Sequence, residues 1–210
     1  MIGYISVHHT GGTLTDPYAS GIKTTLEDID SYHKQRWSDF RSKLGYWVGY
    51  NIVIRPDGSF VQTRLIGEEG AHTKGFNLSA VGICLIGNFT KGVDTPTIQQ
   101  KMTLKNLIKC LLSKRTESMG LKTTSDCVLD IQKDRIFPHR RFFPANTSCF
   151  GDSLSETWAQ ELLEPYSDKG LIAELISEVK RLLSVLDTYK KKKKLGYLPK
   201  SCLFGDDVRG

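Results

Sequence analysis

Strand-like and helix-like segments alternate along the first 163 residues, and this alternation constrains the fold more than any other feature. Apolar and β-branched runs typical of strands occupy residues 2–8, 50–55, 59–63 and 81–86. Amphipathic patterns typical of helices occupy residues 24–37, 98–112 and 153–163. The turn Pro56-Asp57-Gly58 joins two of the strands in a hairpin. Interleaved strands and helices predict an α/β domain with a central mixed β-sheet flanked by helices.

The chain changes character near Pro165 and Gly170, which mark a break after the last helix of the domain. We therefore expect one domain over residues 1–164 and a C-terminal helical tail over residues 165–210. Apolar residues between Leu171 and Leu186 fall on one helix face, which predicts docking on the domain or pairing with a second copy. The run Lys190 to Lys194 supplies five of the six net positive charges, so the basic character is local to the tail.

Cysteine content and hydropathy exclude several protein classes. The five cysteines are an odd number without a CxxC pair, so we expect no disulfide framework, and Cys84 and Cys110 fit small core positions. The sequence contains no run of about 18 apolar residues, so no membrane-spanning helix is expected. The first residues lack a basic leader and a cleavage site, so we also expect no secretion signal.

Histidine and cysteine side chains offer a candidate metal site. Catalytic zinc uses three protein ligands, commonly imidazole or thiolate, and leaves a fourth position open. His8 or His9, at the end of the first strand pattern, could join His139 and Cys149 in such a set. Because successive strand residues point to opposite faces, only one of the two neighbouring histidines can be a ligand. Spacing alone does not specify a metal site.

Six groups of short motifs follow one another in a characteristic order. They are Val7-His8-His9-Thr10-Gly11-Gly12, Gly49-Tyr50-Asn51, Pro56-Asp57-Gly58, Ala71-His72-Thr73-Lys74-Gly75-Phe76-Asn77, Val81-Gly82-Ile83 with Gly87-Asn88-Phe89, and His139-Arg140 with Thr147-Ser148-Cys149. This series resembles the type 2 N-acetylmuramoyl-L-alanine amidases, which share a fold with peptidoglycan recognition proteins and amidase-type phage endolysins. The resemblance covers residues 2–163.

The resemblance implies a zinc-dependent enzyme that cuts the amide bond between the N-acetylmuramic acid lactyl group and L-alanine of peptidoglycan. It implies Zn²⁺ as cofactor, with His8, His139 and Cys149 as ligands. Tyr50 and Thr147 are the implied catalytic hydroxyls, and either could be the main donor to the developing oxyanion. Zinc would activate a water for attack on the carbonyl.

Other residues receive less specific expectations. The resemblance places His72 and Asn77 on the substrate side, where loop organisation is the alternative role. His9 is expected next to the metal ligand, as a packed or substrate-side histidine. His33 lies inside a helical pattern, which favours core or capping duty.

The sequence also departs from the family pattern. Phe150 follows the candidate zinc cysteine where relatives usually have proline, and the loop from His139 to Cys149 runs ten positions where shorter members have eight. The strand Gly82-Ile83-Cys84-Leu85 lacks a glutamate that some relatives use as a general base. The departures leave the three candidate ligands in place and put the shape of the substrate pocket in question.

Two other function classes remain as alternatives. A peptidoglycan recognition module binds without hydrolysis, but such members typically lack the cysteine that is present here as Cys149. Lys190 to Lys194 could attract anionic wall polymers or a membrane surface, whereas no interleaved aromatics indicate a specific nucleic-acid partner. We expect bacterial peptidoglycan as the partner. Without a leader, we expect a phage or prophage protein, made in the host cytoplasm and acting on the wall after release.

Overall fold

The computed structural model describes residues 1–13 and 15–165, together with separate helical positions between 176 and 191. Its centre is a five-stranded sheet in the order β3-β2-β4-β1-β5. The strands are β1 (Tyr4–His9), β2 (Ile52–Ile54), β3 (Phe60–Gln62), β4 (Ala80–Leu85) and β5 (Ile136–Pro138). β1 is parallel to β4 and β5, and β2 is parallel to β4, whereas β3 pairs antiparallel with β2. The predicted mixed sheet and hairpin are therefore confirmed.

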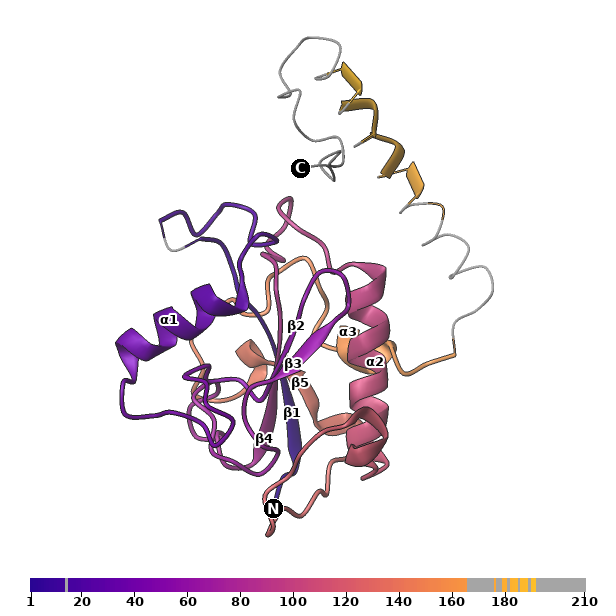
Figure 1. The fold of residues 1–210 in the computed structure, drawn as a ribbon. Coiled ribbons are helices and arrows are strands. Elements are labelled where there is room, and N and C mark those ends of the chain that lie inside the picture. Colours follow the sequence, from indigo (N-terminus) through magenta and orange to yellow (C-terminus); the bar gives the residue numbers. More distant parts are fainter. Residues whose placement is uncertain are drawn as a thin grey trace, which may run out of the picture. The chain divides into compact units, whose positions relative to one another are not determined.

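Two long helices cover opposite faces of this sheet, α1 (Leu26–Arg36) on one and α2 (Ile98–Leu112) on the other (Figure 1). Each begins with a capping box. The hydroxyls of Thr25 and Thr97 accept the N–H of Asp28 and Gln100, whose side chains accept the cap N–H in return. These reciprocal bonds set where both predicted helices start.

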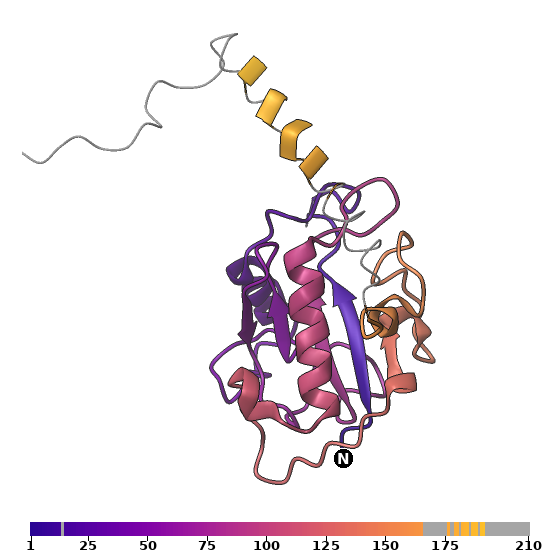
Figure 2. The same cartoon turned by 90° about the vertical axis from the view of Figure 1, so that its right-hand side faces the viewer.

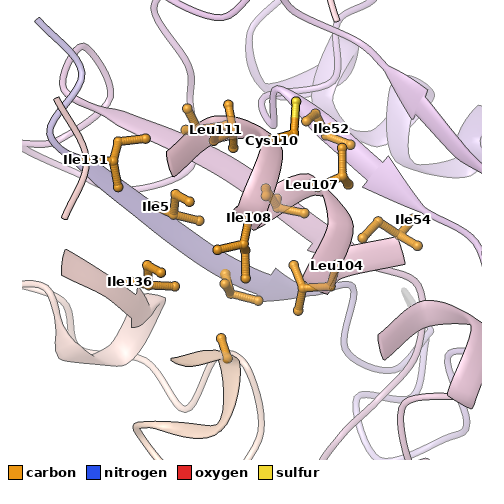
Figure 3. Packing of buried hydrophobic residues seen from close by; sticks show 14 of the residues in the cluster. Ile5, Ile52, Ile54, Leu104, Leu107, Ile108, Cys110, Leu111, Ile131 and Ile136 are labelled. Atoms are coloured by element: carbon orange, nitrogen blue, oxygen red, sulfur yellow. The ribbon is translucent and has the colours of Figure 1, made fainter. Parts of the chain in front are cut away.

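The face covered by α2 forms the main apolar core. Figure 2 shows α2 in front of the sheet, with its axis running roughly along β1. Ile5 and Val7 of β1 are fully buried there, in one cluster with Leu104, Leu107 and Ile108 of α2 (Figure 3). Because side chains alternate along a strand, Ser6 and His8 of β1 point to the opposite face. The sheet therefore has an apolar face under α2 and a partly polar face on the other side.

The last helix of the domain is much shorter than its pattern predicts. A helix was expected over residues 153–163, whereas α3 spans only Trp158–Glu161. The N–H and hydroxyl of Ser153 both donate to the Phe89 carbonyl, at 3.2 and 2.6 Å. These bonds tie the preceding segment to the loop after β4, and the chain becomes helical only after Thr157.

Met1–Pro165 form one compact unit. Of the apolar stripe between Leu171 and Leu186, the structure describes Ile176, Val179, Leu182, Leu183 and Leu186, all helical, whereas Leu171 and Leu175 lie outside the described residues. Most of the run Lys190 to Lys194 also lies outside them, so the docking of the stripe and the division at residue 164 stay predictions. Within the described part of the chain, no helix combines the length and apolar character needed to cross a bilayer. The four cysteines that the structure describes are free, and Cys84 and Cys110 are buried as predicted.

A buried arginine organises the segment between α1 and β2. The Arg64 guanidinium donates to three backbone carbonyls, those of Val48 at 2.7 Å, Phe40 at 2.6 Å and Glu69 at 3.2 Å. The side chain is only 1% exposed. One cation thus binds two carbonyls of the segment before Tyr50 and the carbonyl of Glu69, which holds the backbone of that segment in place.

His33 completes this support from α1, as the predicted core role requires. It is buried, and its Nδ1 accepts the N–H of Gly49 at 3.0 Å. Burial, and then the nearby charge of Arg36, lowers the pKa of His33 from 6.5 to about 4. The neutral imidazole is therefore the form that the fold requires.

We predict that His33 makes the fold sensitive to acid. Its folded pKa of about 4 lies below the ordinary 6.5, so between these pH values the unfolded chain takes up a proton on His33 that the folded chain does not. The stabilisation is therefore complete above pH 6.5 and is lost as the pH falls toward 4. Between about pH 7 and about pH 5 this should cost about 2 kcal/mol of unfolding free energy. Denaturant titrations of the parent and of His33→Gln should show a correspondingly smaller loss in the variant. Equal losses in both proteins would contradict this role.

Candidate metal centre

Three potential metal ligands, far apart in sequence, meet at the carboxyl end of β1. His8, His139 and Cys149 each offer a ligand atom, and these atoms all lie within 4.8 Å of one another. The Nδ1 of His8 lies 3.7 Å from the Cys149 Sγ, and the imidazole centroids of His8 and His139 are 4.7 Å apart. Ligand atoms around a tetrahedral zinc lie about 3.3 to 3.8 Å apart. The three side chains therefore approach the spacing of such a site.

Strand pairing explains why the two histidines meet. β1 and β5 run parallel with Val7 opposite Pro138, so the residues that follow, His8 and His139, emerge side by side. His139 begins a short 3₁₀ turn directly after β5. Sheet register thus determines two of the three ligand positions.

Arg140 places the third ligand. Its N–H donates to the Cys149 carbonyl at 2.8 Å, and its guanidinium donates to the carbonyls of Gly151 and Leu154, the latter at 2.8 Å. Phe150, the departure from the family pattern, is fully buried in the core and packs against Trp158. Its side chain anchors the cysteine loop and lies away from the cavity described below.

Protonation favours the imidazoles as neutral donors. Burial holds the pKa of His8 well below its usual value, with further lowering from His72 and His139, and burial also lowers the pKa of His139. Burial raises the pKa of the Cys149 thiol to about 12. A metal would therefore find two imidazoles with free lone pairs and a thiol that must release its proton on binding. Two nitrogens and one sulfur form a donor set that fits zinc.

His9 points away from this group. Its Nδ1 accepts the Phe89 N–H at 2.9 Å, and burial, followed by Arg140, lowers its pKa to about 4. The group of potential ligands contains His8 and omits His9. Of the two histidines that strand alternation left open, His8 is the one that lies with the other potential ligands, and its role as a zinc ligand, implied by the family resemblance, stays a prediction.

Both predicted catalytic hydroxyls lie near the three ligands. The Tyr50 ring is centred 5.0 Å from that of His8, and burial, followed by Cys84, raises its pKa well above 10. Tyr50 is therefore protonated at neutral pH and able to donate. The Thr147 Oγ1 accepts the Cys149 N–H at 3.1 Å, which leaves its own hydrogen free.

A cavity of about 750 Å³ opens beside these residues. One wall comes from the segment between Thr10 and Thr24 and another from α1, while His9, Tyr50 and Ser148 also line it. Tyr50, whose ring neighbours that of His8, and Ser148, which precedes Cys149 in the chain, connect this cavity to the candidate metal centre, although none of the three potential ligands lines it.

His72 and Asn77 do not line this cavity. The Asn77 Oδ1 accepts the N–H groups of both His72 and Thr73, at 3.0 and 2.7 Å, and so shapes its own turn. His72 is buried beneath His8, with the two ring centroids 5.3 Å apart. The structure gives both residues internal contacts, and their predicted contact with substrate stays a prediction.

The sequence assigned no role to Ser6, and Thr73 and Arg140 appeared there only as members of motifs, without a role of their own. Ser6 could have been noticed, because it shares the face of His8 in a period-two strand. The Thr73 Oγ1 lies 3.3 Å from the Nε2 of His8, a contact between residues 65 positions apart that no local pattern reveals.

Comparison with known proteins places this geometry in a family. The chain is 30% identical to peptidoglycan-recognition protein SC2 of Drosophila melanogaster over 115 residues, 54% of this chain and 56% of that protein. It is 35% identical to an endolysin of Klebsiella phage KP32 over 75 residues, 33% of this chain and 44% of the endolysin. The chain spans about half the length of the curated relatives it matches.

A solved structure gives a broader match. N-acetylmuramoyl-L-alanine amidase LysC from Clostridium intestinale URNW aligns with a TM-score of 0.55 and 25% identity, covering 77% of this chain and 85% of that one. The family model Amidase_2, described as N-acetylmuramoyl-L-alanine amidase, matches residues 1–152, which include all three candidate ligands. The chain therefore belongs to the N-acetylmuramoyl-L-alanine amidase family.

Proposed function

We propose that this chain is a zinc-dependent N-acetylmuramoyl-L-alanine amidase acting on bacterial peptidoglycan. The bond cut is the amide between the lactyl group of N-acetylmuramic acid and L-alanine. The observation that carries the proposal is the convergence of His8, His139 and Cys149 beside Tyr50, which itself lines the cavity. Family membership and the similarity to an amidase structure support the same reaction.

The chain's own groups divide the work. His8, His139 and the Cys149 thiolate would hold zinc, which when bound polarises the carbonyl and activates water at neutral pH. Tyr50, kept protonated by burial, donates toward the oxygen that gains charge as the carbonyl becomes tetrahedral. Such a donor typically contributes about 3 to 4 kcal/mol to transition-state stability. The Thr147 hydroxyl is a second donor from the cysteine loop.

A phage or prophage endolysin is the narrower biological role that we propose. The similarity to the Klebsiella phage endolysin supports it. In this role the chain would act on the wall after release from the host cytoplasm.

Peptidoglycan recognition without hydrolysis is the second candidate, favoured by the similarity to peptidoglycan-recognition protein SC2. Incubating the zinc-loaded chain with purified peptidoglycan separates the two candidates. An amidase should release new L-alanine amino termini with time. Peptidoglycan binding without such release would support the recognition role.

We predict that Cys149→Ser loses zinc and hydrolysis together, because a buried thiolate is replaced by a weak ligand. Zinc affinity should fall by more than about 100-fold, since even changes behind a ligand cost about 10- to 100-fold. Metal content after dialysis and a chelator competition measure the loss. His9→Gln is the matched control and should keep its zinc. Full zinc retention in Cys149→Ser would refute the ligand assignment, and zinc loss in His9→Gln alone would identify the wrong member of the histidine pair.

Tyr50→Phe should retain zinc and fold but lower turnover by about 10²- to 10³-fold, because it removes a donor to the oxyanion. Thr147→Val should lower turnover less, since this threonine sits on the loop and already supports the Cys149 N–H. Rates of amino-terminus release from zinc-loaded variants provide the comparison. The opposite order of effects would make Thr147 the main donor. Unchanged turnover in Tyr50→Phe would show that the Tyr50 ring serves only in packing.

A further inference from the structure

Behind His8 lies a line of buried polar side chains that the proposed reaction does not use. The Nε2 of His8 is 2.9 Å from the Ser6 Oγ, on the side of the ring away from Cys149. The Ser6 Oγ is 2.8 Å from the Thr73 Oγ1, which is 2.9 Å from the Nδ1 of His72. Thr73 also approaches the His8 Nε2, at 3.3 Å. Ser6, His8 and Thr73 are at most 1% exposed, so solvent is not an alternative partner.

The backbone is built around the far end of this line. A Cβ added at Gly70 or Gly82 would lie 2.3 or 2.5 Å from the imidazole of His72, so both glycines leave room for this ring. The Asn77 carboxamide fixes the backbone of His72 and Thr73 from the other side. The position of Thr73 relative to His8 is therefore held by the fold as well as by its own hydroxyl contacts.

Hydrogen counting gives the line a direction. A neutral imidazole carries one N–H and one acceptor nitrogen, and a hydroxyl donates one hydrogen. If His8 faces a metal with its Nδ1, its Nε2 carries the hydrogen and donates to Ser6. Ser6 then donates to Thr73, and Thr73 donates to the Nδ1 of His72. The opposite direction would put a hydrogen on the His8 Nδ1, facing Cys149, and would block metal binding there.

We propose that Ser6 and Thr73 are positioning residues of the metal centre, whose hydroxyls, ending on His72, hold His8 in the tautomer that presents its Nδ1 to the metal. This inference rests on the proposed zinc site. Metal-bound histidines commonly donate their second N–H to a carboxylate, a carbonyl or water, which fixes the ring and raises its basicity. Here a pair of buried hydroxyls performs that function.

The end of the line is consistent with a role beyond simple packing. Among the described residues, none provides a hydrogen-bond partner for the Nε2 of buried His72. An unpaired buried polar group typically costs about 1 to 3 kcal/mol. An apolar residue at position 72 would avoid this cost. The imidazole is therefore expected to have a role through its Nδ1, which accepts the hydrogen of the Thr73 hydroxyl.

Zinc affinity tests the proposal on the full chain, by competition with a chromophoric chelator at neutral pH. Thr73→Val and Ser6→Ala remove one hydroxyl each and should weaken zinc binding by about 10- to 100-fold. Thr73→Ser keeps the hydroxyl and should restore affinity to within about threefold of the parent, within the usual context-dependence of single contacts. Thr124→Val, at another buried threonine, is the matched control and should bind zinc like the parent. Folding of each variant is checked by its circular dichroism and thermal midpoint.

A second readout reports the tautomer directly. In ¹⁵N-histidine NMR spectra of the zinc-loaded parent, His8 and His72 should both carry their hydrogen on Nε2. Parent-like zinc affinity in folded Thr73→Val, or a hydrogen on the Nδ1 of His72, would overturn the proposal. If Ser6→Ala does not fold, the Thr73 pair and the NMR spectra still decide it. A parent chain that binds no zinc would instead refute the proposed function itself, so the two failures are distinguishable.

Discussion

The parallel pairing of β1 between β4 and β5 is the constraint on which the rest of the structure depends. It places the end of β1 beside the ends of both neighbours, so that His8 lies next to His139 and, in the β4 register, opposite Cys84. A shift of one residue would turn His8 toward α2 and Val7 toward the metal centre. The apolar side chains under α2 oppose that shift, because Ile5 and Val7 would leave a fully buried cluster. The hydrophobic core thus sets the geometry of the chemistry.

Most of the fold could be predicted from the sequence, because its elements carry strong local signals. β1 and β4 are apolar runs, and α1 and α2 combine helical spacing with threonine capping boxes. The end of the domain could not be predicted in this way. The pattern from Ser153 is compatible with a helix, but the bonds of Ser153 to the Phe89 carbonyl form only in the folded chain. A tertiary contact there overrides local propensity.

The candidate site likewise contains some residues that local motifs predict and others whose contacts form only in the folded chain. The three potential ligands and Tyr50 were found through ordered motifs, and the structure brings them together. The supporting roles of Ser6, Thr73 and Arg140 were not predicted, because the contacts of these side chains depend on the register of distant strands and on one loop turn. Ser6 and Thr73 are separated by 67 positions, and Arg140 supports Cys149 through backbone carbonyls that any residue could supply. Sequence motifs therefore identify potential metal ligands more readily than they assign roles to the side chains that orient those ligands.

The two faces of β1 explain how the fold tolerates so polar an interior. Ser6, His8, His72 and Thr73 are all buried, and such groups favour folding only when their hydrogen bonds are satisfied. The hydrogen bonds among these four side chains satisfy nearly all of their polar groups and leave the Nδ1 of His8 available for a metal. Stability comes mainly from the opposite face, where α2 buries aliphatic side chains against the same strand. One strand can therefore belong to a close-packed apolar core and still hold a reactive side chain at its end, because the alternation of its residues keeps the two environments apart.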